Sequence, residues 1–131
     1  MRTLIAEDDF TSRLLLQSFL SRYGECHVAV NGKEAVESFR LSLENGRRYD
    51  LVCMDIMMPE MDGQAAVCGI RALEESAGFL STSGSKIIMI TALDDVKNVV
   101  TSFKALCDAY IFKPVDIAQL LTQLKSMALV P

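Results

Sequence analysis

YDLVCMDIMMPEMDG, the stretch from Tyr49 to Gly63, decides the fold of this chain. Leu51 to Met54 is an apolar run short enough to be one buried strand. The run ends on an acid, Asp55, and a proline and a glycine follow soon after it. Because ligands of open α/β sheets bind outside the carboxyl ends of the strands, we expect Asp55 to lie where a reacting group would be placed. Taken alone, the same pattern also fits a strand that stops at a polar turn.

Four more short apolar runs alternate along the chain with segments of helical periodicity. The predicted strands are residues 3–6, 26–30, 51–54, 86–90 and 108–112. Helices are predicted at about residues 10–23 and 94–106, and three others begin after the capping residues Asn31, Asp62 and Asp116. This alternation predicts an α/β fold: a doubly wound, five-stranded parallel sheet of flavodoxin-like order 2-1-3-4-5, with helices on both faces.

Length, charge and composition exclude several classes of protein. A chain of 131 residues suits one domain, so we expect a single domain over residues 1–131 with no output domain. The net charge of −4, with no basic run longer than Arg47-Arg48, argues against DNA as a partner. No signal peptide or membrane span is apparent, which predicts a cytoplasmic protein. His27, the single histidine, is interpreted as structural.

The strand order predicts a cluster of acids at one edge of the sheet. Strands 3–6 and 51–54 become neighbours, so Glu7, Asp8 and Asp55 should meet beyond their ends. Crowded carboxylates repel one another unless a cation lies among them, and a hard divalent ion such as Mg²⁺ prefers oxygen ligands. Considered singly, Glu7 and Asp8 are better explained as acids at the start of a helix.

Three further residues have an ordinary structural interpretation when each is taken alone. Thr91 fits a helix cap, Lys113 a solvated charge at a strand end, and Tyr110 a half-buried strand aromatic. Separate structural roles do not explain why acids follow the predicted strands 3–6 and 51–54, a hydroxyl follows strand 86–90 and a cation follows strand 108–112. The combination therefore favours a functional site over unrelated local roles.

Four motifs occur in order, each at the end of a predicted strand. They are IAEDD at Ile5 to Asp9, MDIMMPEMDG at Met54 to Gly63, ITA at Ile90 to Ala92, and YIFKP at Tyr110 to Pro114. With these motifs the whole chain resembles the receiver domain of two-component response regulators, of the chemotaxis type with a single domain. The resemblance implies a protein of phosphorelay signalling.

The resemblance also implies a role for each motif residue. Asp55 would be the phosphoacceptor, and Mg²⁺ would be held by Glu7, Asp8, Asp55 and the backbone carbonyl of Met57. Thr91 and Lys113 would contact the phosphoryl group. Thr91 and Tyr110 would form the switch, and the Lys113-Pro114 peptide bond would be cis.

The function that follows is a receiver that takes a phosphoryl group from a histidine kinase or a histidine phosphotransfer protein. Phosphorylation would change the face formed by the helix predicted at residues 94–106, the strand predicted at residues 108–112 and the last helix, which begins after Asp116, and so control a downstream protein target. Such a chain is not an enzyme beyond catalysing its own phosphorylation and dephosphorylation.

Two alternatives remain open from the sequence. One is a Mg²⁺-dependent phosphohydrolase with a transient aspartyl phosphate, although such enzymes commonly carry an acid where this chain has Met57. The other is a degenerate receiver that is never phosphorylated, which the intact acids, Thr91 and Lys113 argue against.

Overall fold

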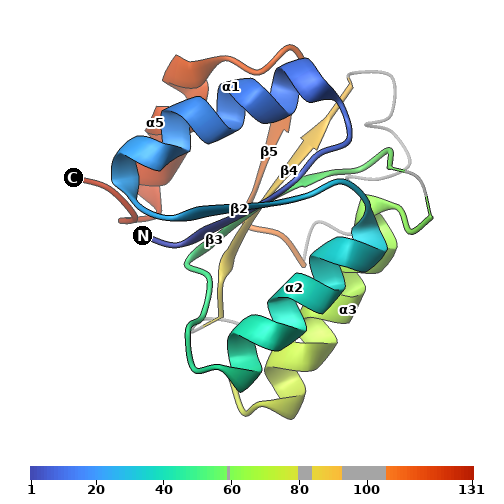
Figure 1. Cartoon of the computed structure of the whole chain (residues 1–131). Coiled ribbons are helices and arrows are strands. Elements are labelled where there is room, and N and C mark those ends of the chain that lie inside the picture. Colours follow the sequence, from blue (N-terminus) through green and yellow to red (C-terminus); the bar gives the residue numbers. More distant parts are fainter. Residues whose placement is uncertain (59, 80–83, 93–105) are drawn as a thin grey trace.

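The computed structural model describes residues 1–58, 60–79, 84–92 and 106–131 and shows a sheet between two layers of helices (Figure 1). The elements in chain order are β1 (Thr3–Ala6), α1 (Phe10–Leu20), the 3₁₀ turn η1 (Ser21–Tyr23), β2 (Cys26–Ala29), α2 (Gly32–Glu44), β3 (Leu51–Asp55), α3 (Gly63–Ser76), β4 (Lys86–Thr91), β5 (Ala109–Phe112) and α5 (Ile117–Ser126). The helix predicted at residues 94–106 falls almost wholly on residues 93–105, which lie outside the described residues. Within the described ranges, no helix has the length and apolar character that a membrane crossing needs.

The sheet confirms the predicted topology. Its five strands are parallel and lie in the order β2-β1-β3-β4-β5. Ala6 pairs with Met54, so the residues that follow them, Glu7 and Asp55, emerge at the same level of the sheet. Asp55 pairs in turn with Ile90 of β4. The register therefore gathers the ends of the three central strands at one edge.

Each face of the sheet is covered by a different pair of helices. In Figure 1, α1 and α5 lie on one face and α2 and α3 on the other. Successive strand residues point to opposite faces. Accordingly, Leu4 and Val52 belong to the core under α2 and α3, whereas Ile5 and Cys53 belong to the core under α1 and α5. All residues of β1 and β3 are buried, which explains why these strands are apolar without alternation.

The helix starts are set by side-chain caps, as the sequence predicts. Asn31, Asp62 and Asp116 each accept a backbone N–H of the first turn, with distances of 2.7 Å to Glu34 and 2.9 Å to Ala65. Such bonds satisfy donors that have no partner inside the helix. The cap residues therefore fix where α2, α3 and α5 begin.

The ends of some elements differ from prediction by one to three residues. The helix predicted to Tyr23 ends at Leu20 and continues as the 3₁₀ turn, which Gly24 ends with a φ of 148°. β5 begins at Ala109, one residue later than predicted, and the Asp108 carboxylate just before it accepts the Ile87 N–H at 2.8 Å. β3 is longer than predicted and includes Asp55.

Candidate functional site

Three carboxylates meet at the carboxyl edge of the sheet. Glu7 and Asp8 directly follow β1, and Asp55 is the last residue of β3. One carboxylate oxygen from each of the three lies within 4.8 Å of the other two. Glu7 is 0% and Asp55 3% exposed, whereas Asp8 is exposed to solvent. The structure thus brings together the acids that the strand order predicts to be neighbours.

Lys113, which follows β5, reaches across the edge to two of these acids. Its Nζ lies 2.8 Å from Glu7 Oε1 and 3.2 Å from Asp55 Oδ2. The backbone of Lys113 is held in place because its N–H donates to the Thr91 carbonyl at 2.8 Å. The Lys113-Pro114 bond is cis, as the family resemblance implies. One ammonium group therefore bridges two buried carboxylates.

The burial of this cluster changes the acid–base properties of its members. Burial, together with the negative charge of Glu7, raises the pKa of Asp55 to about 7, although Lys113 opposes the shift. For Lys113, burial acts to lower the pKa, but the hydrogen bond to Glu7 and the charges of Asp55 and Glu7 outweigh it and raise the pKa. Negative charge at this edge is thus only partly compensated by the lysine.

The site has the donor set of a hard cation. Glu7 Oε2 is buried and has no hydrogen-bond partner among the described residues. A buried acceptor without a partner is costly, and a cation beside it would remove that cost. Mg²⁺ is commonly held by one or two protein carboxylates and keeps several waters. Glu7, Asp8 and Asp55 therefore fit this ion, because one carboxylate oxygen of each lies close enough to the others to share a metal ion.

The other predicted site residues have local partners in this state. Thr91 is 0% exposed and its hydroxyl donates to the carbonyl of Ala92 at 3.1 Å. The Met57 N–H donates to Asp55 Oδ1 at 3.3 Å. Tyr110 is half-buried on β5, and burial together with a hydrogen bond to Cys107 raises its pKa. Thr91 and Met57 adjoin the acids, whereas Tyr110 lies two residues before the end of β5, level with Met89 and further from the acids.

Two glycines support the loop that follows Asp55 by letting the backbone approach closely. The Gly32 N–H donates to the Met61 carbonyl at 3.0 Å, and a Cβ on Gly32 would lie 2.0 Å from that oxygen. A Cβ on Gly63 would lie 2.2 Å from the Asp55 carbonyl oxygen. Real side chains do not tolerate such distances, so both positions need the absence of a side chain. Gly63 within the MDG motif was the only sequence signal for this close approach.

Comparisons with known proteins place the chain in a family. The family model described as "Response regulator receiver domain" matches residues 3–125. The transcriptional regulatory protein SrrA of Staphylococcus aureus is 34% identical over 125 residues, which are 95% of this chain and 46% of SrrA. The chain therefore spans about half the length of that relative.

Two solved structures with a similar fold are complexes that contain Mg²⁺ and BeF₃⁻. CheY in the CheX-CheY-BeF₃-Mg²⁺ complex of Borrelia burgdorferi is similar with 29% identity and a TM-score of 0.76, covering 100% of this chain and 90% of that one. The receiver domain of the histidine kinase CKI1 of Arabidopsis thaliana, in complex with Mg²⁺ and BeF₃⁻, shows 27% identity and a TM-score of 0.77, covering 98% and 90%. With this fold, this edge of acids and the family match, the chain belongs to the response regulator receiver domain family of phosphorelay signalling.

Proposed function

We propose that Asp55 accepts a phosphoryl group from a phosphohistidine of a histidine kinase or histidine phosphotransfer protein. The observation that carries the proposal is the contact of one ammonium, Lys113, with both Glu7 and Asp55 at an edge where three carboxylates meet. A receiver domain is a signalling domain rather than a conventional enzyme. We infer that this one catalyses only its own phosphorylation and dephosphorylation.

The transfer is a substitution at phosphorus. A carboxylate oxygen of Asp55 attacks the phosphorus, the P–N bond to the donor histidine breaks, and its electron pair stays on the imidazole nitrogen. The product is a mixed anhydride on Asp55. Because phosphoryl transfer depends mainly on positioning and on neutralising charge, the Lys113 ammonium contributes by facing the oxygens of the moving group.

Asp55 must be ionised to attack, yet its pKa is raised to about 7 by burial and by Glu7. Glu7, Asp8 and Asp55, with the Met57 carbonyl, would hold Mg²⁺. When bound, the ion supplies positive charge that keeps the carboxylates ionised and neutralises phosphoryl oxygens. The buried, unpartnered oxygen of Glu7 supports this assignment, as do the Mg²⁺ complexes of two similar receiver structures.

The response to phosphorylation is proposed to pass through Thr91 and Tyr110. The Thr91 hydroxyl would exchange its hydrogen bond to the Ala92 carbonyl for one to a phosphoryl oxygen. Tyr110 would then move into the space that the Thr91 side chain leaves. The face that changes would comprise β5, α5 and the segment between β4 and β5. A downstream protein would bind the two states of this face with different affinity.

The proposed setting is a single receiver domain over residues 1–131 in the cytoplasm, with no direct contact to DNA or membrane. The name of SrrA assigns transcriptional regulation to a protein about twice as long. The expectation about DNA therefore concerns the receiver residues alone. The phosphohydrolase alternative is not favoured, since the family that matches is a signalling family.

Intact mass spectrometry tests the proposal. After incubation with a small phosphodonor and Mg²⁺, the wild type should gain one phosphoryl group, and Asp55→Asn should gain none. Asp50→Asn is the matched control, because Asp50 is an exposed aspartate at the other end of β3. Equal labelling of wild type and Asp55→Asn, or labelling that persists in a chelator, would contradict the proposal.

A further inference from the structure

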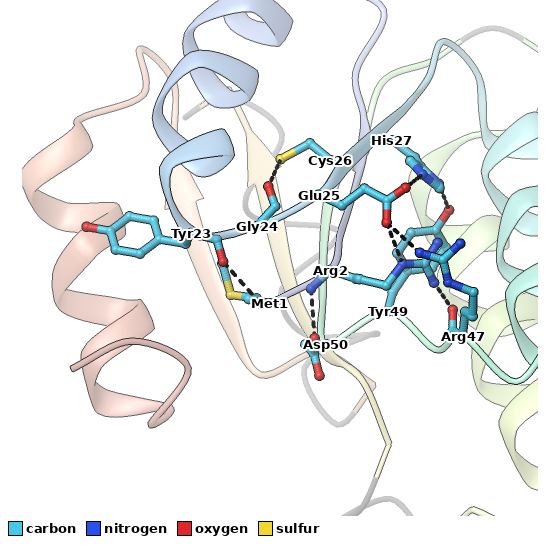
Figure 2. Close-up of polar contacts among 10 residues, drawn as sticks. All are labelled: Met1, Arg2, Tyr23, Gly24, Glu25, Cys26, His27, Arg47, Tyr49 and Asp50. Carbon is cyan, nitrogen blue, oxygen red and sulfur yellow. Dashed lines mark hydrogen bonds and ion pairs between the residues drawn. The ribbon is translucent and has the colours of Figure 1, made fainter.

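The amino edge of the sheet carries a second charged cluster, far from Asp55 along the strands. Figure 2 shows Arg2, Glu25, His27, Arg47 and Tyr49 turned toward one another. Arg2 precedes β1, Glu25 precedes β2, and Arg47 and Tyr49 lie just before β3. Since the strands are parallel, residues that precede neighbouring strands converge at this edge, as those that follow them converge at the other.

Glu25 organises this cluster by accepting three hydrogen bonds. Its carboxylate lies 2.8 Å from His27 Nε2, 3.0 Å from Arg47 Nη2 and 3.2 Å from Arg2 Nε. The hydrogen bonds from His27 and Arg2 lower the pKa of Glu25, which keeps the carboxylate ionised. One carboxylate thus orients two guanidinium groups and an imidazole.

Tyr49 and Arg2 complete the arrangement from the buried side. The Arg2 guanidinium lies 4.9 Å from the centre of the Tyr49 ring, and its Nη1 donates to the Arg47 carbonyl. The Tyr49 hydroxyl lies 2.6 Å from His27 Nδ1. A neutral His27 with its proton on Nε2 satisfies both contacts, because Nε2 donates to Glu25 and Nδ1 accepts from Tyr49. Arg2 is therefore held at two of its three nitrogens.

A pocket of about 270 Å³ opens beside the cluster, between it and the carboxyl-terminal half of α2. Arg2, His27, Arg47 and Tyr49 form one wall, and the polar side chains of Ser38 and Asn45 contribute to the other. The described residues that line the pocket include no carboxylate, and Glu25 is not among them. The lining thus carries two positive charges in a chain whose net charge is −4.

We propose that this pocket binds a small anion that bears a phosphate group. Arg2 Nη2 and the Nε and Nη1 groups of Arg47 donate to no acceptor among the described residues, so they remain available. Planar guanidinium groups suit phosphate oxygens, because two N–H groups can bind two oxygens in parallel. Glu25 fixes the orientation of both arginines without occupying the pocket. The proposal does not depend on phosphorylation of Asp55, which lies at the opposite edge.

The space sets the size of the ligand. A volume of about 270 Å³ admits inorganic phosphate or a phosphate ester with a few carbon atoms. Arg47 is 64% exposed at its side chain, so the site stays open to solvent and the affinity should be on the order of millimolar. Both ligand sources share the phosphate dianion as the recognised group.

The test is a titration of the metal-free protein with inorganic phosphate, at constant ionic strength, followed by amide chemical shifts. We expect saturable shifts at Arg2, His27 and Arg47 and none at Asp55. Arg47→Gln should weaken the binding about fivefold or more, since it removes charge-assisted hydrogen bonds. Arg40→Gln is the matched control, because Arg40 is a surface arginine of α2 that pairs with Glu37 and Glu44 outside the pocket.

Titrations with glycerol 3-phosphate and with succinate identify which anion the pocket prefers. Tighter binding of glycerol 3-phosphate than of phosphate would assign the pocket to an ester, and equal or weaker binding would assign it to the free ion. Succinate binding as tight as that of phosphate would overturn the choice of phosphate. Shifts that rise linearly without saturation, or equal weakening by Arg47→Gln and Arg40→Gln, would overturn the site itself.

Discussion

Both edges of the sheet gather charged residues that adjoin β1 and β3, but the two edges balance these charges in opposite ways. At the carboxyl edge, Lys113 is shared by Glu7 and Asp55, and one oxygen of Glu7 has no partner among the described residues. At the amino edge, Glu25 is surrounded by two arginines and a histidine. The acidic edge is largely buried and short of positive charge, whereas at the amino edge two arginines share one carboxylate. The shortage of positive charge identifies the carboxyl edge as the one that needs a cation and can accept a phosphoryl group.

The largest effect is expected from removing the one lysine that the structure shows on the acids. Lys113→Met should slow phosphorylation by a small phosphodonor about 100-fold at saturating Mg²⁺, because a group that neutralises transferring oxygens is lost. The rate is measured by intact mass against time. Lys125→Met, at the exposed end of α5, is the control and should react at the wild-type rate. A Lys113→Met rate within threefold of the wild-type rate would contradict the claim that the Lys113 ammonium neutralises charge on the transferred phosphoryl group.

A smaller effect is expected when the loop behind Asp55 is displaced. Gly32→Ala places a methyl group 2.0 Å from the Met61 carbonyl oxygen, so the loop between β3 and α3 must shift. A displacement of this kind should slow phosphorylation roughly tenfold while the fold survives. Gly69→Ala is the control, since its nearest neighbour is a side-chain methyl group of Val36 at 3.3 Å and not a backbone atom. If both variants react equally fast, the glycine contact does not position the site.

The next prediction concerns stability and uses the pKa of Asp55. The unfolded chain releases this proton near the ordinary value of 3.8, whereas the folded, metal-free protein keeps it up to about pH 7. The folded state therefore binds more protons between these values, and its stability falls as the pH rises from about 4 to 7. Asp55→Asn removes the buried charge and should stabilise the metal-free protein at pH 8 by about 1–3 kcal/mol. Urea unfolding of both proteins at pH 5 and pH 8 measures this difference. An Asp55→Asn variant less stable than the wild type at pH 8 would refute the claim that burial and the charge of Glu7 make the ionised Asp55 destabilising.

The amino edge should show a smaller effect of the opposite sign. The pKa of Glu25 is lowered by its bonds to His27 and Arg2, so its contribution to stability is present above pH 4.5 and is lost as the pH falls further. Glu25→Gln should therefore lower the melting temperature slightly at pH 7 and not at pH 3. Because exposed ion pairs are screened, the difference should shrink in high salt. A rise in melting temperature at pH 7 would show that the two edges do not differ as described.

The sequence predicted the acidic edge because each of its residues follows a recognisable strand. Short apolar runs that end on Glu7 and Asp55 fix the element type, and the parallel order then brings the ends together. Capping residues such as Asn31 predicted the start of α2 for the same local reason. Apolar runs and capping residues lie within, or directly beside, the strand or helix that they predict.

The features that the sequence did not predict depend on partners distant along the chain. Glu74 is 3% exposed on α3 because Arg71 Nη1 at 2.6 Å and the Ser85 N–H at 2.6 Å satisfy its carboxylate. The pocket at the amino edge likewise needs Arg2 and Arg47, which no local motif connects. Side-chain pairs of this type follow from the packed structure and not from periodicity.

The central claim is that the undercompensated acid Asp55 carries the phosphoryl group, and chemical mapping tests it most directly. Borohydride reduces an aspartyl phosphate to homoserine, which leaves a mass change at the modified residue. After phosphorylation with Mg²⁺, reduction and digestion, the account predicts homoserine at position 55 and none at Asp8, Asp9 or Asp62. Homoserine at another aspartate, or none in protein that has gained a phosphoryl group, would contradict it.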